Sequence, residues 1–237
     1  LVFTFMLQLI KATVSAPPAR PKKSMFIETV EGLNYMFAHR GLKVMVISLV
    51  GVGLFAKPIT DLLPGFVGEV FNRGPEGLAL LMIAHGGGAM VGAAWMASWG
   101  TGIRGLTRVS IIAIGAASFP IFLFAMAPVF WMALPLIFLV GFAFIMQSIS
   151  NQTLLQSAAD PTMRGRVISN YSLAHQGAPA IGALLIGGIA EQVGLRVPVA
   201  VGAGLCLVLW CWLWRQRHWL ARALEVEGGI PAQPRRP

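Results

Sequence analysis

The chain has 237 residues, of which 56% are hydrophobic and only 11% charged, and its mean hydropathy is +0.73. Soluble domains carry about 25% charged residues, so this composition excludes an ordinary soluble enzyme or binding domain. The net charge of +9 would suit a nucleic-acid partner. The basic residues stand at the ends of apolar runs, however, and form no single patch, which is the pattern of a membrane protein.

The chain begins with a short apolar run, residues 1–14, that starts on Leu1. A spanning helix needs about 20 apolar residues, so we expect this run to be the end of a truncated transmembrane helix and the chain to be a fragment. Residues 15–41 follow as a basic linker that ends in an amphipathic helix lying at the membrane surface. The apolar face of that helix comprises Phe26, Val30, Leu33 and Phe37.

Six long apolar runs come next and predict a six-helix transmembrane bundle over residues 42–214. The predicted spans are 42–63, 77–98, 107–127, 129–150, 168–190 and 197–214. If the linker is cytoplasmic, alternation leaves only Arg73 and Arg196 among the basic loop residues on the outer side, as the positive-inside rule requires. We expect a multi-pass protein of the cytoplasmic membrane, with a mostly disordered cytoplasmic tail over 215–237.

The second and fifth spans share a pattern. His85 and His175 are each followed two residues later by a glycine, and then at equal spacing by Gly92 and Gly182. These spans run in opposite directions, so the match predicts an inverted repeat of three helices plus three. Small residues would also let the helix backbones pack closely. The packing candidates are Gly88, Gly92, Gly182 and Gly187.

The first span contains Lys57 and Asp61 on either side of Pro58, which predicts a kink. Ionisable groups inside a membrane are costly and are therefore candidates for a site. Lys57 and Asp61 are one helical turn apart and can pair. Two interpretations are open: the pair serves a substrate or proton pathway, or it is a structural ion pair near the outer surface.

Four further polar side chains lie inside predicted spans. His85 and His175 could titrate near neutral pH, or each could be a buried neutral histidine with one partner. Gln147 and Gln176 could donate hydrogen bonds to a ligand or bind neighbouring helices. The third and sixth spans are nearly free of polar groups, so we expect four helices around a polar cavity and two helices facing lipid.

No metal-ligand spacing, phosphate-binding loop or nucleophile elbow is present, so we expect no cofactor, no metal and no enzyme activity. A membrane enzyme would need a clustered catalytic set, and the sequence offers none.

Four stretches carry a family resemblance: EGLNY at 31–35, HRGLK at 39–43, NQTLLQ at 151–156 and RGRV at 164–167. They resemble the central linker and the tenth-to-eleventh helix region of major facilitator superfamily exporters, in the branch of the enterobactin exporter and the macrolide-efflux proteins. The resemblance implies an all-α integral membrane fold in which this chain is the C-terminal six-helix bundle of a twelve-helix transporter. It also identifies Arg164, Gly165 and Arg166 as a cytoplasmic loop motif.

The resemblance further implies alternating-access transport of a small molecule, with efflux of a drug-like or siderophore-like compound as the leading function. The implied partners are the lipid bilayer, the substrate, the missing N-terminal bundle and protons, and no nucleic acid. Two alternatives remain: an uptake transporter of the same fold, or a non-transporting remnant or scaffold. Arg164 and Arg166 either hold the loop against headgroups or the partner bundle, or simply follow the positive-inside rule.

Overall fold

The computed structural model describes residues 25–98, 102–103 and 105–225. The predicted truncated helix at 1–14 and the residues 226–237 of the predicted tail lie outside these ranges. Helices make up the described chain, and no strand occurs in it. They are α2 (Met25–Ala38), α3 (Arg40–Phe55), α4 (Ile59–Gly65), the π-helix η1 (Phe66–Val70), α5 (Pro75–Ser98), α6 (Leu106–Met126), α7 (Phe130–Ala158), α8 (Arg164–Val193) and α9 (Arg196–Leu224).

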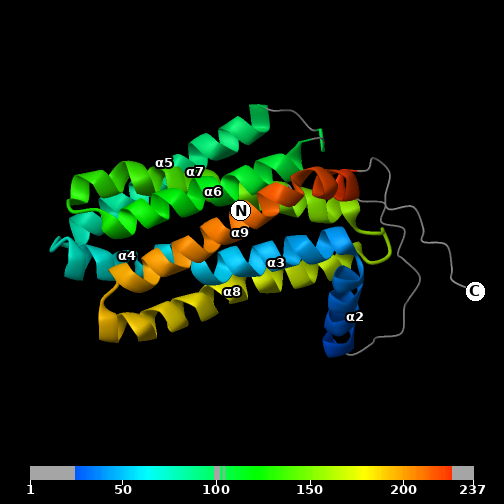
Figure 1. Ribbon diagram of the computed structural model, residues 1–237, viewed down its shortest axis with the longest axis horizontal. Coiled ribbons are helices and arrows are strands. Elements are labelled where there is room, and N and C mark those ends of the chain that lie inside the picture. The colour runs from blue at the N-terminus through cyan, green and yellow to red at the C-terminus, as the bar shows by residue number, and fades with distance from the viewer. Residues whose placement is uncertain (1–24, 99–101, 104, 226–237) are drawn as a thin grey trace, which may run out of the picture.

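Six helical segments in the described ranges are long and apolar enough to cross a membrane, with α3, α4 and η1 together forming the first. The all-α, six-span architecture predicted from the sequence is confirmed. The spans run side by side along one axis, and α2 lies across one end of the bundle (Figure 1). We call this end the α2 end and the opposite end, which carries the start of α5, the distal end.

The first span is interrupted at residues 56–58, between α3 and α4. Pro58 has no backbone N–H, so the helical ladder cannot continue through it. The amides of Ala56 and Lys57 both donate to the Val52 carbonyl, at 2.9 and 3.0 Å, and the chain restarts as α4. The expected kink is therefore a break of three residues that form a turn between two helices, close to the middle of the span.

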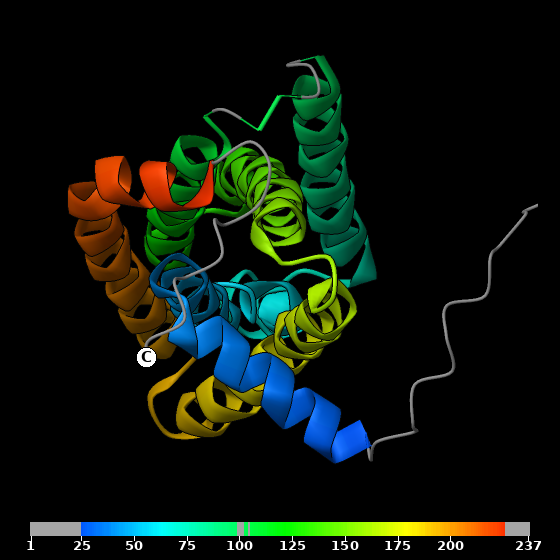
Figure 2. The same ribbon diagram turned by 90° about the vertical axis from the view of Figure 1, so that its right-hand side faces the viewer.

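Corresponding helices of the predicted inverted repeat show the same pattern of residue burial. The succession of buried, half-buried and exposed residues over 81–96 in α5 recurs position for position over 171–186 in α8. Packing repeats as well, because α5 packs on α7 while α8 packs on α3, and α7 and α3 are themselves the first helices of the two repeats. Viewed along the bundle, α5 and α8 lie on opposite flanks with α7 and α3 between them (Figure 2).

Helix α6 is packed more deeply in the bundle than the sequence predicted. Both α6 and α9 were predicted to face lipid. Helix α6, however, is packed between α7 and α9. Of its most apolar 18 residues 67% are buried, against 22% for α5 and 17% for α8. Hydropathy could not reveal this, because a protein interior and a lipid tail are equally apolar surroundings for a side chain. The exposed part of α6 is an apolar stripe that includes Ile112, Phe119, Phe122, Leu123 and Met126.

Helix α9 is longer than predicted, since it continues beyond 214 to Leu224. Leu213, Leu220 and Leu224 are buried at helical spacing, which extends the packed face past the apolar run. The guanidinium of Arg217 lies 4.6 Å from the ring centre of Trp214 and donates to its carbonyl at 2.9 Å. Charged residues in this stretch are therefore compatible with a continued helix.

Candidate functional site

Three spans meet at a polar cluster that consists of Lys57, Ser148, Tyr171 and His175. Lys57 comes from the break between α3 and α4, Ser148 from α7, and the other two from α8. The ammonium Nζ of Lys57 lies 2.6 Å from Nε2 of His175. A lysine ammonium can only donate, so Nε2 of His175 accepts this hydrogen bond.

The rest of the cluster encloses the same imidazole. Ser148 Oγ lies 3.2 Å from Nε2 of His175. The Tyr171 ring, one turn earlier on α8, is 5.4 Å from the imidazole centre, and its hydroxyl donates to the Ser148 carbonyl at 3.4 Å. Lys57 and His175 are both half-buried, so the cluster is neither closed to the exterior nor fully exposed.

Glycines bring α8 close enough for this contact. A Cβ at Gly182 would overlap the carbonyl oxygen of Leu54, just before the break, and one at Gly53 would come within 2.7 Å of the Ala178 side chain. On the other side, a Cβ at Gly202 of α9 would lie 2.7 Å from the Phe55 carbonyl oxygen. The backbones of α8 and α9 therefore both pack closely against the first span, and the close approach of α8 places His175 beside Lys57.

Asp61 does not pair with Lys57. Its side chain is exposed, and no ion pair joins the two residues where the structure describes them. The break explains this difference, because residues on either side of it no longer follow the spacing of one continuous helix.

His85 occupies the position in α5 that His175 has in α8, but its surroundings differ. Its ring lies 6.3 Å from that of Phe144, and Nδ1 is buried with no hydrogen-bond partner in the described part of the chain. Main-chain contact between α5 and α7 is again made through glycine: a Cβ at Gly88 or Gly92 would meet backbone atoms of Phe138 or Phe142. His85 does not contact the Lys57 cluster.

The two candidate glutamines lie in different surroundings. Gln147 is 2% exposed, and its Nε2 has no partner in the described part of the chain. Gln176 is exposed beside His175. At Gly187 a Cβ would meet nothing within 4 Å, so this glycine makes no close approach within the bundle. No group of three His, Cys, Asp or Glu side chains that could hold a metal ion occurs among the described residues.

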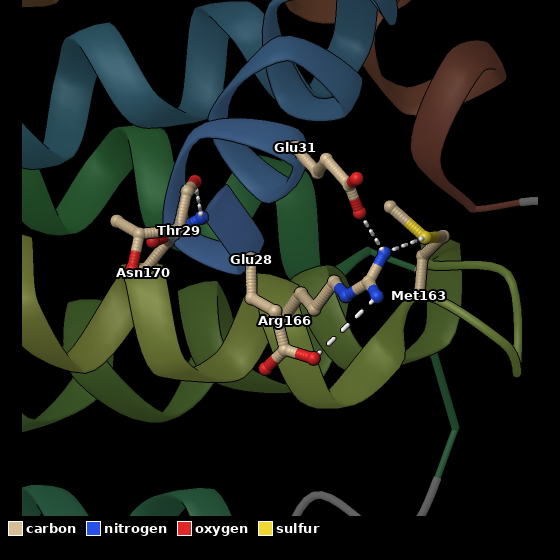
Figure 3. A network of polar contacts seen from close by, with 6 residues as sticks. All are labelled: Glu28, Thr29, Glu31, Met163, Arg166 and Asn170. Carbon is tan, nitrogen blue, oxygen red and sulfur yellow. Dashed lines mark hydrogen bonds and ion pairs between the residues drawn. The ribbon is translucent and has the colours of Figure 1, made fainter. Parts of the chain in front are cut away.

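A second polar network joins α2 to α8 at the α2 end of the bundle (Figure 3). Arg166 donates to Glu31 at 2.7 Å and lies 3.7 Å from Glu28, while the Asn170 amide donates to the Thr29 carbonyl at 3.0 Å. Arg164, by contrast, is exposed. No sequence pattern indicated that Glu28 and Glu31 pair with Arg166.

The loop before α8 is ordered by local hydrogen bonds. The hydroxyl and the amide of Thr162 both donate to Asp160, at 2.7 and 2.9 Å, and they hold the pKa of that carboxyl below its ordinary value. The amide of Asp160 donates to the Tyr35 hydroxyl of α2 at 3.2 Å. The loop and α2 are therefore fixed to each other on both sides of Arg166.

Sequence reasoning also missed Ser148 and Tyr171. Tyr171 stands four residues before His175, a spacing that places both on one helix face and could have been noticed. Ser148 gave no signal, because its role depends on how α7 packs against α8.

A family model described as transmembrane secretion effector matches residues 1–227. Searches of curated proteins and of solved structures found no match to the chain.

Proposed function

The chain belongs to the transmembrane secretion effector family of major facilitator transporters, and from that premise we propose that it forms the substrate-handling six-helix half of a secondary exporter. The proposed cargo is a drug-like or siderophore-like small molecule, moved by alternating access out across the cytoplasmic membrane.

The contact between Lys57 and His175 carries this proposal. Two ionisable side chains in mid-span are expensive to keep unless they serve a pathway. They also lie at a helix break, and discontinuous helices near the membrane midplane are where secondary transporters bind substrate and ions. Ser148 and Tyr171 add neutral hydrogen-bonding groups, which suits a cargo of mixed polarity.

The cluster offers a simple switch. With Nε2 of His175 unprotonated, the lysine is held against it at 2.6 Å. A proton on Nε2 removes the acceptor and sets two cations side by side in a medium of low dielectric constant, where like charges repel strongly. Lys57 would then be released from His175, and either an anionic group of the cargo or loss of the proton would restore balance. Asp61 is the nearest acidic residue along the chain that could take part.

A second six-helix bundle is the proposed partner. Helices α5 and α8 are the least buried spans of the described chain, and they flank the side on which α7 and the α3–α4 break lie (Figure 2). Alternating access requires one bundle to rock against another around the site. We assign the α2 end to the cytoplasm, because Arg40, Lys43, Arg108 and Arg166 lie there with the arginines near the C-terminal end of α9, whereas Arg73 and Arg196 lie at the opposite end.

Flux in oriented vesicles tests the proposal. The native gene is expressed in an efflux-deficient host, and growth is screened against a panel of drug-like and siderophore-like compounds. A protective compound, in radiolabelled form, should accumulate in inside-out vesicles from those cells above the level of vesicles without the protein. Accumulation in right-side-out vesicles alone would replace export by uptake. Absence of flux for every compound that changes growth would refute transport by this cluster.

A further inference from the structure

A groove of about 370 Å³ lies between the first two turns of α3 and the end of α9, away from the polar cluster. Its walls are Arg40, Lys43, Val44 and Ile47 from α3, and Trp212, Gln216 and Trp219 from α9. The two helices run antiparallel here. A Cβ at Gly41 would meet Leu224 and Ala223, and one at Gly51 would meet Leu209.

This register gives the groove one direction of polarity. Arg40 and Lys43 lie, beside Trp219, at the end of the groove nearer to α2, which we call the outer end of the groove. Ile47 and Trp212 lie further along the span, toward its middle. From Arg40 to Ile47 the helix rises about 10 Å at 1.5 Å per residue. Cations therefore stand at the level where spans end, tryptophans at the interface, and aliphatic side chains toward the hydrocarbon, which is the order of groups along a phospholipid.

The cations are available to a ligand. Arg40 and Lys43 are exposed, and neither side chain has an ion pair or hydrogen bond to a residue that the structure describes. Among the residues that the structure describes, no acidic side chain lines the groove. The N-terminus of α3, the positive end of its helix dipole, lies at the same end of the groove. The groove thus favours an anion at its outer end.

The inner walls favour an acyl chain over a soluble anion. Ile47, Trp212 and Trp219 are 39%, 42% and 37% exposed, which is a large apolar area to leave open beside two cations. Residues 11–24 are poor occupants, because they carry four basic and no acidic side chains and would be repelled by the two cations. We propose that this groove binds an anionic phospholipid, with its phosphate on Arg40 and Lys43 and one acyl chain along Ile47 and Trp212.

Native mass spectrometry of the purified protein in detergent tests this site. Dioleoyl phosphatidylglycerol should bind at one saturable site and more tightly than dioleoyl phosphatidylcholine. The double variant Arg40→Gln/Lys43→Gln should lose about 20–30-fold in affinity for the anionic lipid, and each single variant about fivefold. Arg108→Gln removes an exposed cation at the same end of the bundle but outside the groove, and should bind like the unaltered protein.

The outcomes separate clearly. Equal binding of the two lipids, or unchanged phosphatidylglycerol binding in the double variant, would overturn the proposal. Inorganic phosphate that displaces the lipid at millimolar concentration would show a simple anion site and would also overturn it. If the double variant fails to elute as a folded species in size-exclusion chromatography, the two single variants still decide the question.

Discussion

The ammonium group of Lys57 contacts the imidazole of His175 at 2.6 Å, although the two residues are far apart in the sequence and belong to opposite halves of the inverted repeat. The break at Pro58 makes this possible, since it lets Lys57 leave the path of a regular helix. The same break separates Lys57 from Asp61, its expected partner.

The first prediction concerns this contact. Lys57→Gln and His175→Gln should each reduce transport by the full-length protein to a small residual flux while the protein still inserts in the membrane, because each removes one half of the switch. In residual activity, His175→Gln should also flatten the pH dependence of flux. The control is His218→Gln, at an exposed histidine near the end of α9.

Vesicle flux at several pH values and quantitative immunoblotting of membranes are the measurements. Wild-type flux with an unaltered pH profile in both variants would show that the contact is only structural. Asp61→Asn belongs in the same series. Loss of transport there would place the exposed carboxylate on the pathway, and normal transport would remove it from the site.

A second prediction uses two glycines of one helix. Gly182→Ala should destabilise the bundle by roughly 1–3 kcal/mol, because the new methyl group would overlap the Leu54 carbonyl and push α8 from the broken span. Gly187→Ala should be neutral, or stabilising by up to about 1 kcal/mol, because its Cβ meets nothing and alanine favours the helix. Reversible unfolding in mixed micelles measures both. Equal effects at the two positions would contradict the proposed close approach.

The sequence predicted the spans and the repeat because these depend on the chain's own pattern. An apolar run of the right length and the matching glycines around His85 and His175 are local features. How deeply α6 is packed in the bundle could not be predicted from its own sequence, because its apolar surface suits contact with α7 and α9 as well as contact with lipid. Hydropathy therefore predicted where α6 crosses but not what covers it.

The site was partly predictable for a similar reason. Lys57 and His175 are conspicuous as ionisable residues in apolar runs, so both could be named as candidates. Their contact could not be foreseen, because the regular helix geometry that suggested Asp61 as partner fails at the break. Glu28 and Glu31 are distant from Arg166 in the sequence, so their pairing with it could not be foreseen either.

A third prediction tests the network in Figure 3. A double-mutant cycle of Arg166→Gln with Glu31→Gln should give a coupling free energy of about 0.2–1 kcal/mol, since the pair is short but partly exposed. The coupling should shrink at high salt. The same cycle with Arg164→Gln should give none, because Arg164 is exposed and pairs with no described residue. Similar coupling for both arginines would mean that only net charge matters at this end.

The fourth prediction concerns acid. The hydrogen bonds from Thr162 lower the pKa of Asp160. They should therefore stabilise the turn fully at pH values above the ordinary carboxyl pKa of roughly 4, and this stabilisation should be lost as the pH falls through the lower pKa of the folded protein. The protection factor of the Thr162 amide, which is its exchange rate relative to the intrinsic rate at the same pH, should therefore fall on acidification. Asp160→Asn should show low protection at neutral pH too, because it lacks the negative charge. A Thr162 amide with the same protection factor at both pH values would contradict this role.

The last prediction concerns the end of α9. The two carboxylate oxygens of Glu225 accept from the amides of Gly105 and Thr107, at 2.8 and 2.9 Å, at the start of α6. This cap satisfies donors that the helix itself cannot, and it places negative charge at the positive end of the α6 dipole. Glu225→Ala should therefore lower the free energy of unfolding by about 0.5–2 kcal/mol and expose both amides to hydrogen exchange.

Glu225→Gln should lower the free energy of unfolding less, because it keeps one acceptor. Glu191→Ala, at an exposed glutamate of α8, is the matched control. If the amides of Gly105 and Thr107 stay protected in Glu225→Ala, the start of α6 is held by its packing between α7 and α9 and not by this carboxylate.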